Sequence, residues 1–199
     1  MITRKRIIRA LFARWDRFQL WKLRLLERLE IMRCEGVIAL DRTVRFHVPV
    51  GFRGSRGHVE VFSGTCFGHS LVSRWGGIVI QARNPQATVK IGMNCHFSNR
   101  ISIIANERIE IGNNLLCGED VVIIDSDFHP VAPEDRHAGC GKVMPVKIGD
   151  NVWLGDGVMV LKGVEIGDGS VVAARSVVTK SIPPRSLAMG CPAKVFKAL

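Results

Sequence analysis

Along the second half of the chain, apolar residues return at every sixth position. Between residues 148 and 183 the repeating aliphatic positions are Ile148, Leu154, Val160, Ile166, Val172 and Val178. A second series lies four positions after each of them: Val152, Val158, Val164, Ser170, Ser176 and Ile182. A period of six is neither the 3.6 of an α-helix nor the 2 of a half-buried strand. Such a repeat predicts a solenoid, in which each coil buries its apolar side against its neighbours.

The length of the repeat favours a triangular prism. One hexad would form one short flat face, and three hexads would complete a coil of about eighteen residues. The repeating aliphatic residue would point toward the axis of the prism. The small residue that often follows it, as at Gly149, Gly155 and Ala173, would allow the chain to turn at a corner.

The pattern is weaker toward the N-terminus. Residues 37–88 contain short apolar runs separated by glycines, with the six-residue spacing broken, and we expect irregular opening coils built from short strands there. From residue 89 the spacing returns, with Ile91, Phe97 and Ile103 six apart and then Ile111, Cys117 and Ile123.

Residues 125–147 interrupt the repeat with three prolines, two glycines and several charges. A long segment without repeats inside a solenoid predicts a loop that leaves one corner, and such loops commonly carry function. Pro183 and Pro184 then end the repeat. We therefore expect a segment at 1–36, a β-helix at 37–182 with an excursion loop at 125–147, and a tail at 183–199.

The first 36 residues differ in composition from the rest. Apolar residues from Ile8 to Met32 recur at spacings of three, four and seven, which predicts a basic amphipathic α-helix. Residues 1–33 hold ten Lys or Arg and three Asp or Glu, a net +7 of the total +10. This helix could pack on the first coil or its own oligomer, or residues 1–35 could contact an anionic membrane surface. Nucleic-acid binding is not indicated, because no recognition motif accompanies the charge.

Composition limits the remaining possibilities. No run of eighteen apolar residues is present, and arginines interrupt every candidate signal segment near the N-terminus. The six cysteines form no C-x-x-C pair, so we expect free thiols, with neither a zinc site nor a disulfide framework. The expected location is the cytoplasm, with peripheral contact at the inner face of the cell membrane as an open possibility.

Four motifs occur in a fixed order: Asp125-Ser-Asp-Phe-His129-Pro130, then residues 148–155, 177–184 and 190–194. Together with the repeat, they resemble the hexapeptide-repeat acyltransferases, in the branch of maltose, galactoside and polysaccharide O-acetyltransferases. The resemblance covers roughly residues 89–199. It implies a left-handed parallel β-helix, a homotrimer with active sites between subunits, acetyl-CoA as the acyl donor, no metal, and a C-terminal tail that folds back along the prism.

His129 is the candidate catalytic base. Acyl transfer to a hydroxyl needs a group that accepts the hydroxyl proton, and imidazole suits this near neutral pH. An acidic neighbour could orient the ring, and Asp125, Asp127 and Glu119 are all possible. A backbone carbonyl could do the same. The resemblance at D-x-D-F-H-P supports the catalytic role of His129.

The resemblance also implies a site for the donor. Trp153 would line the active site near the acyl group, Gly155 and Ala173 would allow close approach of the pantetheine arm, and Thr179, Lys180 and Lys194 would lie near its far end. Asn99 and Arg136 could contact the acceptor. The γ-type carbonic anhydrases share this fold class, but no matching set of zinc-binding histidines surrounds the regular coils.

The sequence therefore predicts an acetyl-CoA-dependent O-acetyltransferase that acts on a sugar hydroxyl of a cell-surface polysaccharide or its precursor. Two alternatives stay open. One is an acetyltransferase for another acceptor, such as an amino sugar, serine or an antibiotic. The other is a non-catalytic β-helix scaffold. The presence of His129 and Trp153 at the positions that the motifs require argues against this alternative.

Overall fold

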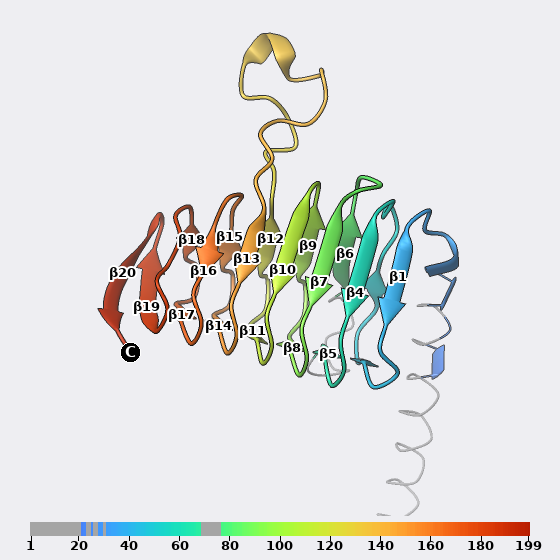
Figure 1. Cartoon of the computed structure of the whole chain (residues 1–199), viewed down its shortest axis with the longest axis horizontal. Coiled ribbons are helices and arrows are strands. Elements are labelled where there is room, and N and C mark those ends of the chain that lie inside the picture. The colour runs from blue at the N-terminus through green and yellow to red at the C-terminus, as the bar shows by residue number, and fades with distance from the viewer. Residues whose placement is uncertain (1–20, 23–24, 26–27, 30, 69–76) are drawn as a thin grey trace, which may run out of the picture.

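The computed structural model of the chain describes residues 21–22, 25, 28–29, 31–68 and 77–199. Within them the strands form three sheets, parallel except for the last strand of the second, and the sheets wrap into one elongated prism (Figure 1). The first sheet contains β1 (Val37–Leu40), β4 (His58–Val61), β7 (Thr88–Ile91), β10 (Arg108–Ile111), β13 (Val146–Ile148) and β16 (Glu165–Ile166).

The second sheet contains β2 (Arg45–Phe46), β5 (Cys66–Phe67), β8 (His96–Phe97), β11 (Leu116–Cys117), β14 (Trp153–Leu154), β17 (Val171–Val172), β19 (Ser186–Gly190) and β20 (Ala193–Ala198). The third contains β3 (Val50–Gly51), β6 (Ile78–Ala82), β9 (Ser102–Ala105), β12 (Val122–Ile124), β15 (Met159–Val160) and β18 (Val177–Val178). Each coil gives one strand to each sheet in turn, so the prediction of a mainly-β parallel solenoid is confirmed.

The six-residue repeat sets the core. All six repeating aliphatic positions from Ile148 to Val178 are buried, and so are the six positions four residues later. Each hexad therefore sends two side chains inward, one from the strand and one from the corner. The two buried serines of the second series bind the C-terminal tail: Ser170 Oγ donates to the Pro183 carbonyl at 2.8 Å, and Ser176 Oγ accepts from the Gly190 N–H at 3.0 Å.

The opening coils keep a continuous parallel register although the six-residue spacing is broken. Strands β1, β4 and β7 pair in parallel with continuous register, as in Val37↔His58 and His58↔Thr88. Inside these coils the rings of Phe46, Phe67 and Phe97 stack at centroid distances of 5.4 and 5.0 Å. The prediction of short strands in irregular coils is confirmed by the unequal coil lengths: Val37 and His58 are 21 residues apart and His58 and Thr88 are 30 apart, whereas Lys147 and Glu165 are 18 apart.

The C-terminal tail extends the second sheet. Strand β19 pairs in parallel with β17 through Val171↔Leu187, and β20 returns antiparallel to β19 at the end of the sheet. The tail thus adds two strands beyond the last coil and does not fold back along the prism as expected. The reason is that β19 satisfies the exposed hydrogen-bonding edge of β17.

The predicted helix over residues 1–36 lies largely outside the described residues. Trp21 and Met32 are among its few described positions with helical backbone, and the helix as a whole stays a prediction. Among the described residues, no helix has the length and apolar character needed to cross a bilayer.

Two edges of the third sheet position the candidate site. At the edge between the second and third sheets lie the corners that contain Asn99, Glu119, Gly155 and Ala173. The edge between the third and first sheets carries the excursion loop, which leaves after β12, holds the short 3₁₀ helix η1 (Pro133–Asp135) and returns at β13 (Figure 1). We call these the second–third edge and the third–first edge.

Candidate active site

The excursion loop has a narrow neck at the third–first edge. Ser126 and Val143 form an antiparallel bridge, and the Asp127 N–H donates to the Lys142 carbonyl at 3.0 Å. The Met144 N–H donates to the carbonyl oxygen of Asp125 at 2.8 Å. These hydrogen bonds join the two arms of the loop at its base, so the backbone is held in place where the residues toward His129 begin.

Asp125 binds the neighbouring coil. Its fully buried carboxylate accepts hydrogen bonds from the backbone N–H groups of Asn106, Glu107 and Arg108 at 2.8, 2.7 and 2.9 Å. Three hydrogen bonds from backbone N–H groups to one buried carboxylate hold the two coils together strongly. In this geometry Asp125 fixes the corner between β9 and β10 and is not the partner of the His129 ring.

Asp127 forms a half-buried ion pair with Lys162, in the turn between β15 and β16. The pair holds the neck of the loop against the next coil toward the C-terminus. No sequence pattern indicated a role for Lys162, because it follows an ordinary hexad and its partner Asp127 lies 35 residues earlier. Asp127 reaches His129 through the backbone, where the His129 N–H donates to the Asp127 carbonyl at 2.7 Å.

His129 lies in the exposed part of the loop, and its Nδ1 lies 2.9 Å from the backbone carbonyl oxygen of Arg136. A carbonyl can only accept a hydrogen bond, so Nδ1 carries the proton and the neutral ring has an unprotonated Nε2. Of the possible orienting groups, the geometry therefore favours the backbone carbonyl. Arg136, expected to contact the acceptor, meets His129 through its main chain.

The backbone around His129 is tightly built. Phe128 has a φ of 60°, a left-handed conformation that is uncommon for a bulky residue. A Cβ on Gly141 would lie 2.2 Å from the His129 carbonyl oxygen, so the return arm passes His129 only because residue 141 has no side chain. The loop thus presents the imidazole from a constrained turn.

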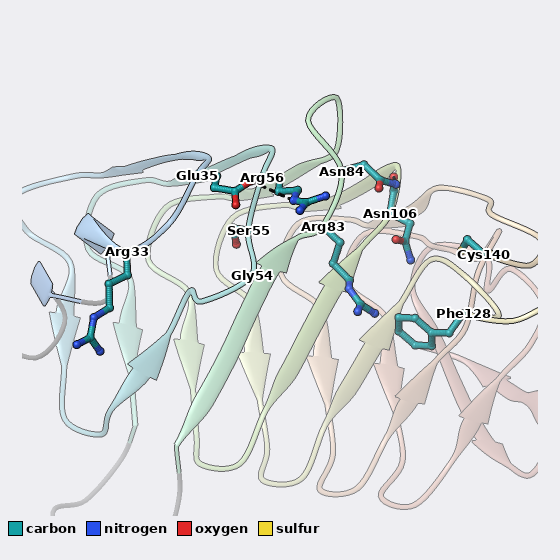
Figure 2. A pocket seen from close by; sticks show the side chains of 10 residues that line it. All are labelled: Arg33, Glu35, Gly54, Ser55, Arg56, Arg83, Asn84, Asn106, Phe128 and Cys140. Carbon is teal, nitrogen blue, oxygen red and sulfur yellow. Dashed lines mark hydrogen bonds and ion pairs between the residues drawn. The ribbon is translucent and has the colours of Figure 1, made fainter. Parts of the chain in front are cut away.

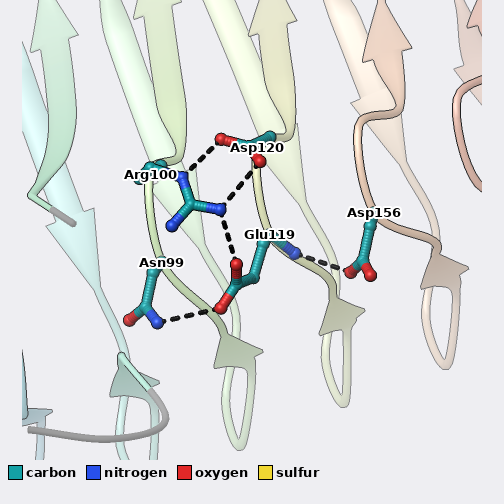
Figure 3. Close-up of polar contacts among 5 residues, drawn as sticks. All are labelled: Asn99, Arg100, Glu119, Asp120 and Asp156. Carbon is teal, nitrogen blue, oxygen red and sulfur yellow. Dashed lines mark hydrogen bonds and ion pairs between the residues drawn. The ribbon is translucent and has the colours of Figure 1, made fainter. Parts of the chain in front are cut away.

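At the second–third edge, Figure 3 shows a polar network centred on Glu119. Asn99 is buried, and its Nδ2 donates to Glu119 Oε1 at 3.0 Å. Arg100 bonds to Glu119 at 2.6 Å and to Asp120 at 2.7 Å, and its guanidinium lowers the pKa of the Asp120 carboxyl. Within the part of the chain that the structure describes, Asn99 Oδ1 is buried and has no hydrogen-bond partner. Glu119 is therefore committed to this network and cannot orient His129 of the same chain.

Trp153 lies beside this edge on the outer side of β14, with 54% of its surface exposed. It stands in register with Leu116, and both line a cavity of about 440 Å³ that His96 also borders. A large exposed tryptophan beside an apolar neighbour is a surface suited to covering by a ligand or by another subunit.

Gly155 and Ala173 lie at the same edge. A Cβ on Gly155 would meet the Ala174 backbone nitrogen at 2.6 Å, so stacking of the coils already requires glycine there. Thr179 and Lys180 follow β18 at the opposite, third–first edge, and Lys194 lies in β20.

The predicted site residues therefore fall into two groups on opposite edges of the third sheet. His129, Thr179 and Lys180 lie at the third–first edge; Asn99, Gly155 and Ala173 lie at the second–third edge, with Trp153 beside it. Within one chain these two groups stay apart.

Cys66, Cys95, Cys117, Cys140 and Cys191 form no disulfide, and burial raises the pKa of the Cys117 thiol, which disfavours the reactive thiolate. No group of three or more His, Cys, Asp or Glu side chains that could hold a metal ion occurs among the described residues.

Comparison with known families matches the regular coils directly. The family described as bacterial transferase hexapeptide (six repeats) matches residues 145–180, the segment in which the repeat forms complete coils. Residues 145–180 are therefore hexapeptide repeats. The relatives described next confirm that the chain resembles the galactoside and polysaccharide O-acetyltransferase branch.

Curated relatives of this chain carry acetyltransferase names. A putative acetyltransferase of Schizosaccharomyces pombe is 40% identical over 121 residues, which cover 58% of each chain. Galactoside O-acetyltransferase of Escherichia coli is 37% identical over 113 residues, 57% of this chain and 55% of that protein. The chain thus spans a little over half the length of the curated relatives it matches.

Similarity to solved structures extends over more of the chain. The polySia specific acetyltransferase NeuO is 27% identical with a TM-score of 0.65, over 82% of this chain and 72% of that one. A galactoside acetyltransferase in complex with coenzyme A is also 27% identical, with a TM-score of 0.56 over 86% of this chain and 68% of that one.

Proposed function

We propose that this chain is an acetyl-CoA-dependent O-acetyltransferase that acetylates a sugar hydroxyl, on a left-handed parallel β-helix. The observation that carries the proposal is the bond between His129 Nδ1 and the Arg136 carbonyl, which leaves Nε2 ready to accept a proton. The acetyltransferase names of the relatives, and the coenzyme A complex of the galactoside acetyltransferase, support the choice of donor and acceptor.

The reaction follows from that tautomer. Nε2 of His129 accepts the proton of the acceptor hydroxyl as the oxygen attacks the thioester carbonyl carbon of acetyl-CoA. A backbone N–H stabilises the tetrahedral oxyanion. When the intermediate collapses, the C–S bond breaks, the imidazolium returns its proton to the thiolate, and the acetyl ester and free coenzyme A leave. No protein-bound acyl group is formed, so a direct transfer needs both substrates at once.

The site is proposed to form between copies of the chain in a homotrimer. His129 lies at the third–first edge, whereas Trp153, Gly155 and Ala173 lie at or beside the second–third edge. A cyclic arrangement would bring the loop of one subunit to the Trp153 edge of the next, and three such contacts would close the ring. The exposed Trp153 and Leu116 would then be covered.

Within that site, the donor would contact both edges. Trp153 would lie near the acyl group, while Gly155 and Ala173 would border the pantetheine arm. Thr179, Lys180 and Lys194 would meet the far end of coenzyme A, where the lysines suit phosphate as point charges. Asp125 and Asp127 would act through the neck of the loop, and Asn99 would contact the acceptor.

The acceptor is proposed to belong to a cell-surface polysaccharide or its lipid-linked precursor. The support is the net charge of +7 on residues 1–33, which would attract this segment to an anionic membrane from the cytoplasmic side. Deletion of residues 1–35 should reduce binding to phosphatidylserine vesicles. Unchanged vesicle binding would remove the membrane part of the proposal.

The donor site can be tested by thermal unfolding of the full chain with acetyl-CoA. Acetyl-CoA at 100 times its Kd should stabilise the folded state by about 2.7 kcal/mol and raise the Tm. Release of free thiol with a panel of sugars would then identify the acceptor. No saturable shift at millimolar acetyl-CoA would contradict the proposal and favour a non-catalytic scaffold.

A further inference from the structure

A second cavity, of about 460 Å³, lies at the third–first edge beside the neck of the excursion loop (Figure 2). Of the described residues that line it, three are arginines, Arg33, Arg56 and Arg83, and one is acidic, Glu35. The described part of the lining is therefore mainly positive, with Arg56 and Arg83 beside the excursion loop. A concave surface lined by one sign of charge concentrates ions of the other sign.

The ion pair within this cavity is weak. Arg56 Nε lies 3.1 Å from Glu35 Oε2, and the two side chains are 60% and 73% exposed. An ion pair so open to water contributes little to stability. Arg56 can therefore exchange Glu35 for the anionic group of a ligand at small cost.

Arg83 connects the cavity to the candidate base. Its guanidinium carbon lies 5.3 Å from the centroid of the Phe128 ring, and Figure 2 shows the two side chains facing each other. Phe128 immediately precedes His129 and has the constrained φ of 60°. A ligand that binds Arg83 would thus lie next to the residue that sets the backbone of His129.

The rest of the lining suits a saccharide. The side-chain amides of Asn84 and Asn106 line the cavity, and each has its orientation fixed by one hydrogen bond: Asn84 Nδ2 to the Asn106 carbonyl, and Asn106 Nδ2 to Ser126 Oγ. Amides with a defined orientation are well suited to sugar hydroxyls, and Phe128 offers an aromatic face to sugar C–H groups.

We infer that this cavity binds the negatively charged group of an acidic saccharide acceptor, either a carboxylate or a phosphate on the sugar chain whose hydroxyl reaches His129. Guanidinium groups bind both anions through paired N–H donors. The inference rests on the proposed function and narrows its substrate class from sugars in general to acidic saccharides. A lipid headgroup shares the anionic chemistry, but it would make no use of the oriented amides beside the His129 loop.

Calorimetric titration of the full chain can test this with pairs of soluble oligosaccharides. The acidic members are an oligogalacturonate, an oligosialate and a phosphorylated maltooligosaccharide, each compared with an uncharged chain of equal length. At least one acidic member should bind about tenfold or more tightly than its partner, and Arg56→Gln and Arg83→Gln should each weaken it about tenfold. Arg83→Lys should retain part of the affinity. Arg45→Gln, an exposed arginine on the second sheet, is the matched control and should change nothing.

Three results would overturn the inference. One is the absence of any acidic preference, and another is an equal loss of affinity in Arg45→Gln. The third is loss of binding to phosphatidylserine vesicles in the Arg56 and Arg83 variants without any saccharide preference, which would assign the cavity to lipid. The change in Tm with acetyl-CoA, measured for each protein, separates the two proposals. Normal acetyl-CoA binding without a preference for acidic saccharides contradicts only this inference. Absence of acetyl-CoA binding in the unmodified chain contradicts the proposed function.

Discussion

The backbone carbonyl of Arg136 lies 2.9 Å from Nδ1 of His129 and determines which nitrogen of the imidazole can accept a proton. The two residues are seven positions apart in the excursion loop, on either side of η1. An orienting carboxylate is therefore unnecessary here. The carbonyl fixes the tautomer without adding a negative charge beside the ring.

His129→Ala should reduce turnover by about 10²–10⁴-fold, because the acceptor hydroxyl then loses its base. The fold should be unaffected, since His129 is exposed. Thiol release from acetyl-CoA measures turnover, and the thermal shift with acetyl-CoA measures donor binding, which should persist. His137→Ala, a second histidine exposed in the same loop, is the matched control and should retain activity. Turnover near that of the unmodified protein in His129→Ala would contradict the assignment.

Asp125→Asn should act mainly on stability. An amide offers one oxygen to the three N–H donors of residues 106–108 and turns its own N–H groups toward them, so the free energy of unfolding should fall by about 2–3 kcal/mol. Urea unfolding measures this loss. If Asp125 instead acted directly on the imidazole, the variant would keep its stability and lose kcat, and that result would contradict a positioning role.

A site shared between subunits can be tested by mixing two impaired variants. His129→Ala and Trp153→Ala homotrimers should each have low activity, because every site lacks one partner. Unfolding and refolding them together in equal amounts should restore about one quarter of the sites, since a site then combines His129 from one subunit with Trp153 from its neighbour. No recovery, with mixed trimers confirmed by native mass spectrometry, would contradict a site shared between subunits.

The Arg100–Asp120 pair predicts a pH-dependent contribution to stability. The hydrogen bond from Arg100 lowers the pKa of Asp120, so the folded state holds this carboxylate ionised better than the unfolded chain does. Its contribution is fully present above the ordinary carboxyl pKa of about 3.9 and is lost as the pH falls through the lowered folded value.

Arg100→Gln should therefore unfold at lower urea concentration than the unmodified protein at pH 7, and the gap should narrow below about pH 4. The effect should be modest because both side chains are partly exposed to water. Arg45→Gln serves as the control at each pH. A gap of constant size down to pH 3 would show that Arg100 acts through packing and not through the charge of Asp120.

The sequence alone determined the solenoid and its core. When each hexad forms one face of a three-sided coil, a hydrophobic residue at every sixth position points toward the axis of the coil. The spacing alone therefore predicted that the repeating positions from Ile148 to Val178 are buried. The six-residue spacing also predicted the loop at residues 125–147, where the repeat is interrupted, and the outward position of Trp153. The opening coils escaped this reasoning, because Phe46 and Phe67 and longer strands maintain the coil without the period.

Only the tertiary structure decided what surrounds the candidate base. The partners of Asp125 lie 17 to 19 residues away and the partner of Asp127 lies 35 away, and distances along the chain carry no information about such contacts. The same holds for the arginine-lined cavity, whose members come from successive corners that stack on one edge. The local repeat sets which side of each coil faces inward, whereas chemistry at the edges depends on how the coils stack and on the course of the loop that leaves them.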